Sequence, residues 1–177
     1  GDPDCWRREY DLYFNGFDKV VNHHIKLPKC HDLSIDGDTT YILMEYVQGR
    51  TGNLELNIDE LSYVAKKLGE LQSEWQNKNT NWLRNYPAVE SSFDLWYGKI
   101  KHQLNAPIQD FPEELRHILN DYVNRSNEIF ESFVHLPRTV CHGDVHHDNI
   151  ILLSGDIYLI DWDSSGFGYM GEDAVDM

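Results

Sequence analysis

Alternating apolar and polar runs in the C-terminal part of the chain predict a β-hairpin with polar residues at one end. Two short apolar runs, residues 150–153 and 157–160, flank a turn that contains Gly155, and glycine supplies the backbone angles that a tight turn needs. A polar segment, residues 142–149, comes before the first run, and Asp161 follows the second. The hairpin therefore returns Asp161 to the end at which the polar segment enters.

Apolar residues also recur at the i, i+3, i+4 spacing of amphipathic helices in four segments. The first ends at the stop signal Asn15-Gly16. The second starts at Asn57, with Glu60 placed to complete a capping box. The third covers residues 93–104. The fourth begins at Pro112, and its predicted inner face includes Leu115, Ile118, Leu119, Tyr122, Ile129 and Phe133.

The first helix and a second hairpin precede the Asn57 helix. The predicted inner face of the first helix, which we expect to start at Asp2-Pro3, is formed by Trp6, Tyr10, Tyr13, Phe14 and Phe17. The hairpin turns at Asp36-Gly37-Asp38. Its second strand, residues 41–47, is almost continuously apolar, so we expect it to be central and buried on both faces.

Charge and cysteine content exclude some partners. Thirty acidic and 15 basic side chains give the 177-residue chain a net charge of −15. This surplus argues against nucleic acid or an anionic membrane, because phosphate groups are bound by Lys and Arg. It favours a cationic substrate, although an acidic surface that only maintains solubility is the alternative. No apolar run reaches the length of a membrane span, and Cys5, Cys30 and Cys141 lack a Cys-x-x-Cys spacing, which indicates a reduced, cytoplasmic chain.

The predicted hairpin groups residues that bind hard cations. Asp144, Asn149 and Asp161 offer two carboxylates and a carboxamide, the oxygen ligands that suit Mg²⁺ together with substrate phosphates. The same segment also holds a dense cluster of His and Asp, which permits Zn²⁺ or Fe²⁺ and a metal-dependent hydrolase. Against that alternative, the chain has no H-E-x-x-H spacing.

The order of these residues resembles a known family. Residues 142–149 read H-G-D-x-x-x-x-N, and Asp161 follows in Ile-Asp-Trp-Asp, which is similar to the catalytic loop and metal-binding Asp of protein kinases. Gly143 in place of Arg, and Trp162 after the second Asp, resemble the aminoglycoside phosphotransferase and choline-kinase-like family. The resemblance implies an α+β, protein-kinase-like fold: a partial β lobe over 1–46, a hinge over 47–52, and a mainly helical lobe over 53–177 that bears the catalytic hairpin.

The resemblance also implies roles and ligands. Asp144 would be the catalytic residue, Asn149 and Asp161 would bind Mg²⁺, and ATP would be the co-substrate. The hinge residues that would bind adenine are Glu45, Tyr46 and Val47. Glu9 would pair with a nucleotide-binding Lys, and supporting roles would fall to His142, Asp163 and Asp173. The expected reaction is phosphorylation of a small-molecule hydroxyl, on a cationic amino sugar (an aminoglycoside) or a choline-like amino alcohol. The oligomeric state stays open.

The family's Gly-rich loop and Lys-bearing strand have no counterpart before Glu9. Helices that the family places at its C-terminal end would follow residue 177. The resemblance thus covers nearly the whole chain, whereas the chain covers the middle of the family's fold. We expect the 177 residues alone to be inactive or very weakly active, and a non-catalytic fragment or a nucleotide-binding module is the alternative.

Overall fold

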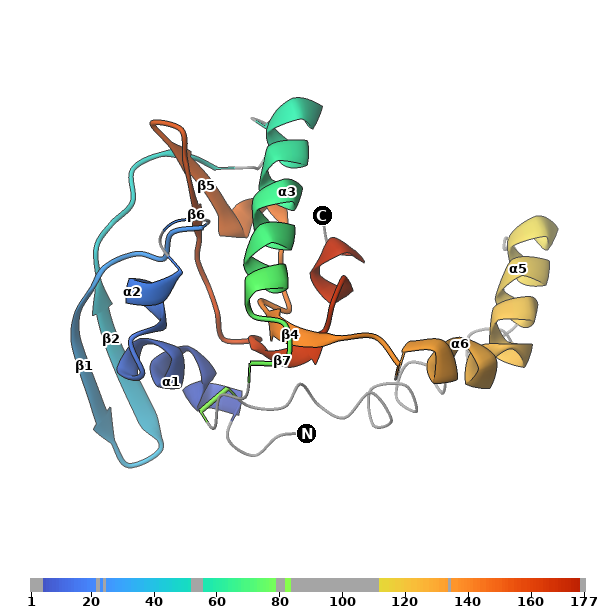
Figure 1. Cartoon of the computed structure of the whole chain (residues 1–177), viewed down its shortest axis with the longest axis horizontal. Helices are drawn as coiled ribbons and strands as arrows, with labels where there is room; N and C mark the ends of the chain where they lie inside the picture. Colours follow the sequence, from blue (N-terminus) through green and yellow to red (C-terminus); the bar gives the residue numbers. More distant parts are fainter. Residues whose placement is uncertain are drawn as a thin grey trace. The chain divides into compact units, whose positions relative to one another are not determined.

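A computed structural model describes residues 5–21, 23, 25–51, 56–78, 82–83, 112–133 and 135–175. The chain divides into two compact units: Gly1–Tyr86 together with Pro137–Met177, and Pro87–Leu136. Figure 1 shows the elements of both units along the chain. None of the helices in the described ranges is long and apolar enough to span a membrane.

The first unit begins with short helical elements. These are η1 (Cys5–Arg7), α1 (Arg8–Phe14) and α2 (Phe17–Val20), and Gly16 joins the two α-helices with φ of 73°. The predicted stop at Asn15-Gly16 is confirmed, and the predicted start at Asp2-Pro3 lies outside the described residues. Tyr13 and Phe17 are buried as predicted, but Phe14 is exposed and stacks on Tyr10. Leu12 occupies the inner face instead, and Phe14, two residues further along α1, lies on the opposite side of the helix.

The predicted N-terminal hairpin is confirmed, with β1 (Cys30–Asp36) antiparallel to β2 (Thr39–Met44). The prediction that its second strand is buried on both faces is wrong. Tyr41 and Leu43 are 56% and 63% exposed, while Ile42 and Met44 pack against the core. Among the described residues β2 pairs with β1 alone, so one face of this two-stranded sheet packs inward and the other is open. The apolar run in the sequence did not show which face of β2 would be buried and which exposed.

Helix α3 (Ile58–Glu74) starts as predicted. The Asn57 side chain accepts hydrogen bonds from the backbone N–H groups of Asp59 and Glu60, and the Glu60 carboxylate accepts one from the N–H of Asn57. The side chains of Asn57 and Glu60 therefore each accept backbone N–H groups at the start of the helix that would otherwise have no partner. The buried face of the helix comprises Val64, Leu68, Leu71 and Gln72.

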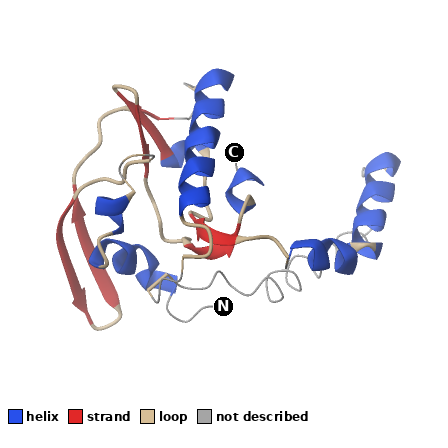
Figure 2. Ribbon diagram, viewed as in Figure 1, coloured by secondary structure: helices blue, strands red, loops and turns tan. Residues whose placement is uncertain are grey.

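The predicted C-terminal hairpin is also confirmed. Strands β5 (Ile150–Leu153) and β6 (Asp156–Leu159) are antiparallel, and a short strand after the first hairpin, β3 (Arg50–Thr51), extends them to a three-stranded sheet in the order β3-β5-β6. A separate pair joins β4 (Arg138–Cys141) to β7 (Gly166–Tyr169), and β7 was not predicted. Figure 2 shows this pair at one end of α3. Short 3₁₀ turns, η2 (His147–Asn149) and η3 (Glu172–Val175), complete the unit.

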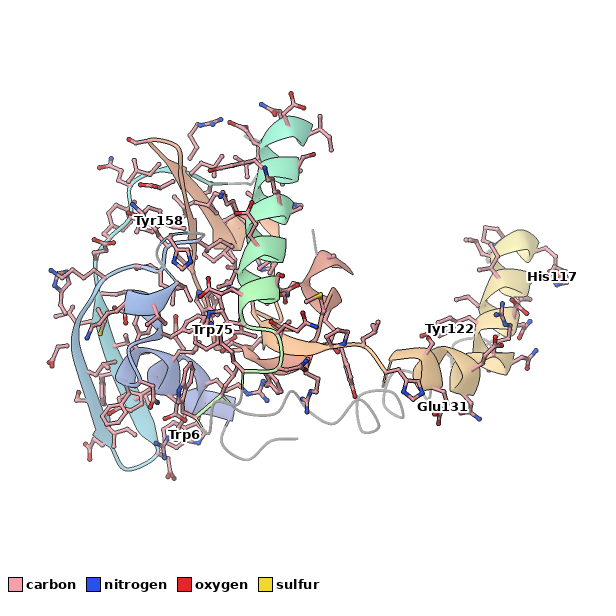
Figure 3. All side chains as sticks on the ribbon, viewed as in Figure 1. Trp6, Trp75, His117, Tyr122, Glu131 and Tyr158 are labelled. Carbon is pink, nitrogen blue, oxygen red and sulfur yellow. The ribbon has the colours of Figure 1, made fainter. Side chains whose placement is uncertain are left out.

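An aromatic cluster forms the centre of the first unit. The ring of Phe17 meets Trp75 at 5.1 Å, Trp162 at 5.4 Å and Trp82 at 5.8 Å between centroids, each edge to face. This is a favourable geometry for aromatic pairs. Figure 3 shows Trp75 at the end of α3, inside the unit. The cluster joins α2 and α3 to the residue after Asp161.

The second unit contains α5 (Glu113–Asn124) and α6 (Ser126–Phe133), interrupted at Arg125. The single long helix predicted from Pro112 is therefore two helices. Leu115, Ile118 and Tyr122 are exposed, so the prediction that they face inward is wrong. Among the described residues of this unit, α5 packs against α6. The predicted helix over 93–104 lies outside the described residues.

Candidate active site

A buried carboxylate holds the start of the segment 142–149. Asp173, on η3, is 1% exposed. Its two oxygens accept the backbone N–H groups of His142 at 3.0 Å and Gly143 at 2.8 Å. The side chain of Gln72 on α3 donates to Asp173 as well, at 2.9 Å. Buried polar groups need such partners, so α3, η3 and the loop form one fixed assembly.

The ring of His142 connects this loop to the exit of the hairpin. The backbone N–H of Asp144 donates to Nδ1 at 3.3 Å, which places the ring proton on Nε2, and Nε2 then donates to the carbonyl of Ile160 at 2.9 Å. Burial lowers the pKa of His142 to about 4, so the ring is neutral near neutral pH. His142 therefore supports the loop and does not supply a proton donor at the surface.

Asp144 and Asn149 lie together after this histidine. Asn149 is buried, and its Nδ2 donates to the backbone carbonyl of Asp144 at 2.9 Å and to its carboxylate at 3.3 Å. An amide that donates in this way presents its Oδ1 as the atom for a cation. His146 Nε2 lies 3.5 Å from the Asp144 carboxylate. The Asp144 side chain is 43% exposed, so a hydroxyl group from solution has access to it.

Asp161 follows β6 in an unusual backbone conformation. Its φ is 63°, in the left-handed region that residues other than glycine adopt rarely. Burial raises the pKa of the Asp161 carboxyl above its ordinary value, and the negative charges of Asp163 and Asp144 raise it further. The structure thus brings the predicted catalytic Asp and the predicted metal-binding Asp within electrostatic reach of each other.

This arrangement fits Mg²⁺. Asn149 and Asp161 supply hard oxygen donors, and a divalent cation would relieve the repulsion among the carboxylates. Among the residues that the structure describes, no group of three or more His, Cys, Asp and Glu side chains is arranged to hold a metal ion. Mg²⁺ characteristically needs only one or two carboxylates and completes its shell with waters and phosphates. A Zn²⁺ or Fe²⁺ hydrolase site takes about three protein ligands, and it stays the alternative to the Mg²⁺ site.

A pocket of about 470 Å³ joins the acidic residues to the first hairpin. One wall comes from the end of β2 and the segment after it: Met44, Glu45, Tyr46 and Val47. Apolar side chains continue the lining: Pro28, Ile151 and Ile160. The carboxylates of Glu9 and Asp161 also line the pocket. Its lining is largely apolar with a few polar groups, as is usual for small-molecule sites.

The predicted hinge residues differ in their surroundings. The backbone N–H of Glu45 donates to the carbonyl of Lys29 at 2.9 Å. Val47 is buried, whereas the side chain of Tyr46 points to solvent and is 90% exposed. The boundaries 47–52 of a hinge between two lobes stay a prediction.

Glu9 reaches the segment after Asp161 from α1. Its Oε1 accepts the backbone N–H of Trp162 at 3.4 Å. Burial raises the pKa of Glu9 above its ordinary value, the N–H of Trp162 opposes this rise, and Asp161 and Asp163 add to it. The predicted pairing of Glu9 with a Lys stays a prediction. Asp163 lies beside this cluster and accepts a hydrogen bond from the Ser164 hydroxyl at 3.0 Å.

Two residues near the site were not identified from the sequence. Gln72 is a polar side chain at an inward position of an amphipathic helix, and that placement was a signal that it has a buried partner. Arg8 donates to the carbonyl groups of Ser164 and Ser165. Arg8 precedes the buried residue Leu12 by one helical turn, so both lie on the same face of the helix. That position was the signal that Arg8 faces inward.

A largely apolar pocket that is lined by carboxylates and lies close to an H-x-D-x-x-x-x-N loop is typical of kinase-like phosphotransferases. The chain belongs to the phosphotransferase enzyme family, whose family model matches residues 6–177. A comparison with curated protein sequences finds no significant match.

Solved structures of this class share the fold. The GDP and kanamycin complex of APH(2")-IIia matches with a TM-score of 0.69 and 14% identity, over 99% of this chain and 63% of its own. The streptomycin-ATP-APH(2")-IIa ternary complex gives 0.59 and 18%, over 96% and 58%. Choline kinase from Cryptosporidium parvum Iowa II gives 0.50 and 17%, over 93% and 49%. The chain is thus α+β and protein-kinase-like, as predicted, and it spans 49% to 63% of the length of these three proteins.

Proposed function

We propose that this chain carries the nucleotide and metal site of an ATP- and Mg²⁺-dependent phosphotransferase that acts on a hydroxyl group of a small molecule. The observation that supports this most directly is a pocket lined both by the segment after β2 and by the carboxylates Glu9 and Asp161. A nucleotide with its base against that segment would direct its phosphates toward these carboxylates. Asp144, in the loop that also carries Asn149, is close enough to Asp161 to raise the pKa of its carboxyl.

Phosphoryl transfer depends on positioning and charge neutralisation more than on covalent chemistry. In this proposal, different residues of the site would have different roles in it. Backbone groups of Glu45, Tyr46 and Val47 would bind the edge of the base. Asn149 and Asp161 would hold Mg²⁺, which when bound neutralises charge on the phosphate oxygens. Asp144, half-exposed, would accept the proton of the attacking hydroxyl.

The net charge supports a cationic acceptor. A net charge of −15 favours the approach of a cationic molecule. The related structures named above include complexes with kanamycin and streptomycin and a choline kinase, which supports an amino sugar or a choline-like amino alcohol. Both acceptors are cationic, and both offer hydroxyl groups.

A substrate panel on the full-length protein tests the proposal. ATP consumption is measured with Mg²⁺ and each of a set of aminoglycosides, choline and uncharged sugars. We expect turnover with a cationic acceptor, and a loss of about 100-fold or more in Asp144→Ala, the range for removing a general base. Asp148→Ala, an exposed residue in the same loop, is the matched control and is expected to keep activity. Hydrolysis of simple esters without ATP consumption would instead favour a metal hydrolase.

A second measurement addresses the 177 residues alone. Mg²⁺-dependent binding of ADP to this chain, followed by calorimetry, reports whether the pocket is assembled within it. Binding without turnover would match a nucleotide-binding module, whereas full turnover would overturn the expectation that the chain alone is inactive.

A further inference from the structure

Two neighbouring residues of α1 hold opposite ends of the segment that follows Asp161. Arg8 is 7% exposed. Its Nη1 donates to the carbonyl of Ser164 at 3.1 Å and to that of Ser165 at 3.2 Å. The next residue, Glu9, accepts the N–H of Trp162. Because these contacts bridge elements at opposite ends of the chain, they fix this segment relative to α1.

The segment itself forms a closed turn. The N–H of Ser165 donates to the carbonyl of Trp162 at 3.1 Å. The indole of Trp162 is buried, and its Nε1 donates to the carbonyl of Leu159 at 3.0 Å. Asp161 lies between β6 and this turn, and its positive φ fixes the direction in which its carboxylate leaves the backbone.

A left-handed residue other than glycine persists only where surrounding contacts over-determine it, because the conformation costs about 1–3 kcal/mol. Upstream of Asp161, the β5–β6 pairing supplies such contacts. Downstream, the turn 162–165 supplies them, and the two carbonyls at its far end are held by Arg8. A planar guanidinium serves two neighbouring acceptors at once, which the single ammonium of Lys does less well.

We propose that Arg8 is a positioning residue for metal binding. Its hydrogen bonds to the turn 162–165 orient the Asp161 carboxylate toward the metal that accompanies the nucleotide. This inference rests on the proposed function. It assigns Arg8 no contact with nucleotide or metal. Residues that orient a metal ligand typically contribute about 10- to 100-fold to metal affinity.

The test measures ADP affinity of the full-length protein by calorimetry, once with Mg²⁺ and once with a chelator. Arg8→Met is expected to weaken the Mg²⁺-dependent part of ADP binding about tenfold or more. ADP binding in chelator is expected to stay nearly unchanged, because Arg8 contacts Ser164 and Ser165 and does not line the pocket. Arg8→Lys is expected to recover part of the loss. The matched control is Arg7→Met, since Arg7 pairs with Asp11 on its own helix.

A second readout needs no ligand. In the metal-free protein, hydrogen exchange of a peptide covering residues 162–165 is expected to accelerate in Arg8→Met and to stay unchanged in Arg7→Met, with thermal unfolding followed in parallel. The measurements are made well below the unfolding transition of each variant.

The outcomes separate this inference from the proposed function. If the wild-type protein binds ADP in a Mg²⁺-dependent way and Arg8→Met binds it equally well, Arg8 does not position the site. If Arg8→Met loses binding equally with and without Mg²⁺, its role is structural, and the inference is again overturned. A wild-type protein that binds no nucleotide would overturn the proposed function, and this inference with it.

Discussion

His142 shows how much one buried residue contributes to the geometry of the candidate site. Both of its ring nitrogens are hydrogen-bonded, one to the loop and one to the hairpin exit, and its ring packs against Trp162 at 4.5 Å between centroids. Protonation would put a second N–H where the ring now accepts one from Asp144. The neutral ring is therefore part of the folded structure.

A pH dependence of stability follows from this residue. Since burial lowers the pKa of His142 from 6.5 to about 4, its contribution to the free energy of unfolding is complete above pH 6.5 and is lost as the pH falls toward 4. At about 1.4 kcal/mol per pH unit the loss amounts to about 3 kcal/mol. Urea unfolding of wild type and His142→Gln at several pH values checks this. The difference between the two proteins should shrink with falling pH, and parallel curves would contradict it.

Gln72 gives a second prediction at this scale. Gln72→Met keeps the volume of the side chain but removes the donor to Asp173, which leaves a buried carboxylate with one hydrogen bond fewer. The expected cost is about 1–3 kcal/mol in the free energy of unfolding. Ser73→Ala, on the exposed side of the same helix, is the control and should change stability little. Equal stability of both variants would show that the Gln72–Asp173 hydrogen bond contributes nothing.

Among the elements, those defined by local signals were predictable. The capping box at Asn57 and the turns at Gly37 and Gly155 are properties of a few adjacent residues, and the structure has all of them. What a strand packs against is not local. The apolar run of β2 therefore gave the wrong burial, and β7 was missed because residues 142–165 separate it from its partner β4.

Replacing two glycines by alanine is expected to change stability in opposite directions, one through close packing and the other through helix propensity. A Cβ on Gly49 would lie 2.6 Å from both Ile151 Cγ2 and the carbonyl oxygen of Leu152, whereas a Cβ on Gly69 in α3 would meet no described atom within 4 Å. Gly49→Ala should destabilise the protein by about 1–3 kcal/mol, as overpacking does. Gly69→Ala should stabilise it by about 0.5–1 kcal/mol through helix propensity. Thermal unfolding of the two variants checks both signs, and a stabilising Gly49→Ala would refute the close contact with β5.

For the whole molecule, the surplus of acid is the dominant electrostatic property. With a net charge of −15, self-repulsion disfavours the compact state. Salt shortens the screening distance from about 30 Å at 0.01 M to about 8 Å at 0.15 M. The Tm should therefore rise over that range, by about 2–4 °C for each 1 kcal/mol gained in a chain of this size. A falling Tm would mean that attractive ion pairs outweigh the repulsion.

The candidate site was only partly predictable at this scale. The loop and the hairpin that bring Asp144, Asn149 and Asp161 together are adjacent in sequence, so their convergence followed from strand pairing. The pocket could not be predicted from the sequence, because its walls come from Pro28, from residues 44–47 and from Ile151 and Ile160. Only tertiary packing places those segments around one cavity, and the contact of Arg8 with Ser164 has the same character.

The pairing of β3 with β5 determines when such a site can form. Arg50 and Leu152 are strand partners although α3 and all of the second unit lie between them in the chain. Closing so long a loop loses chain entropy before contacts compensate it, which places this pairing late in folding. During synthesis, α1 and the first hairpin leave the ribosome long before residues 161–165. A nascent chain stalled before residue 150 would thus present one wall of the pocket with nothing opposite it.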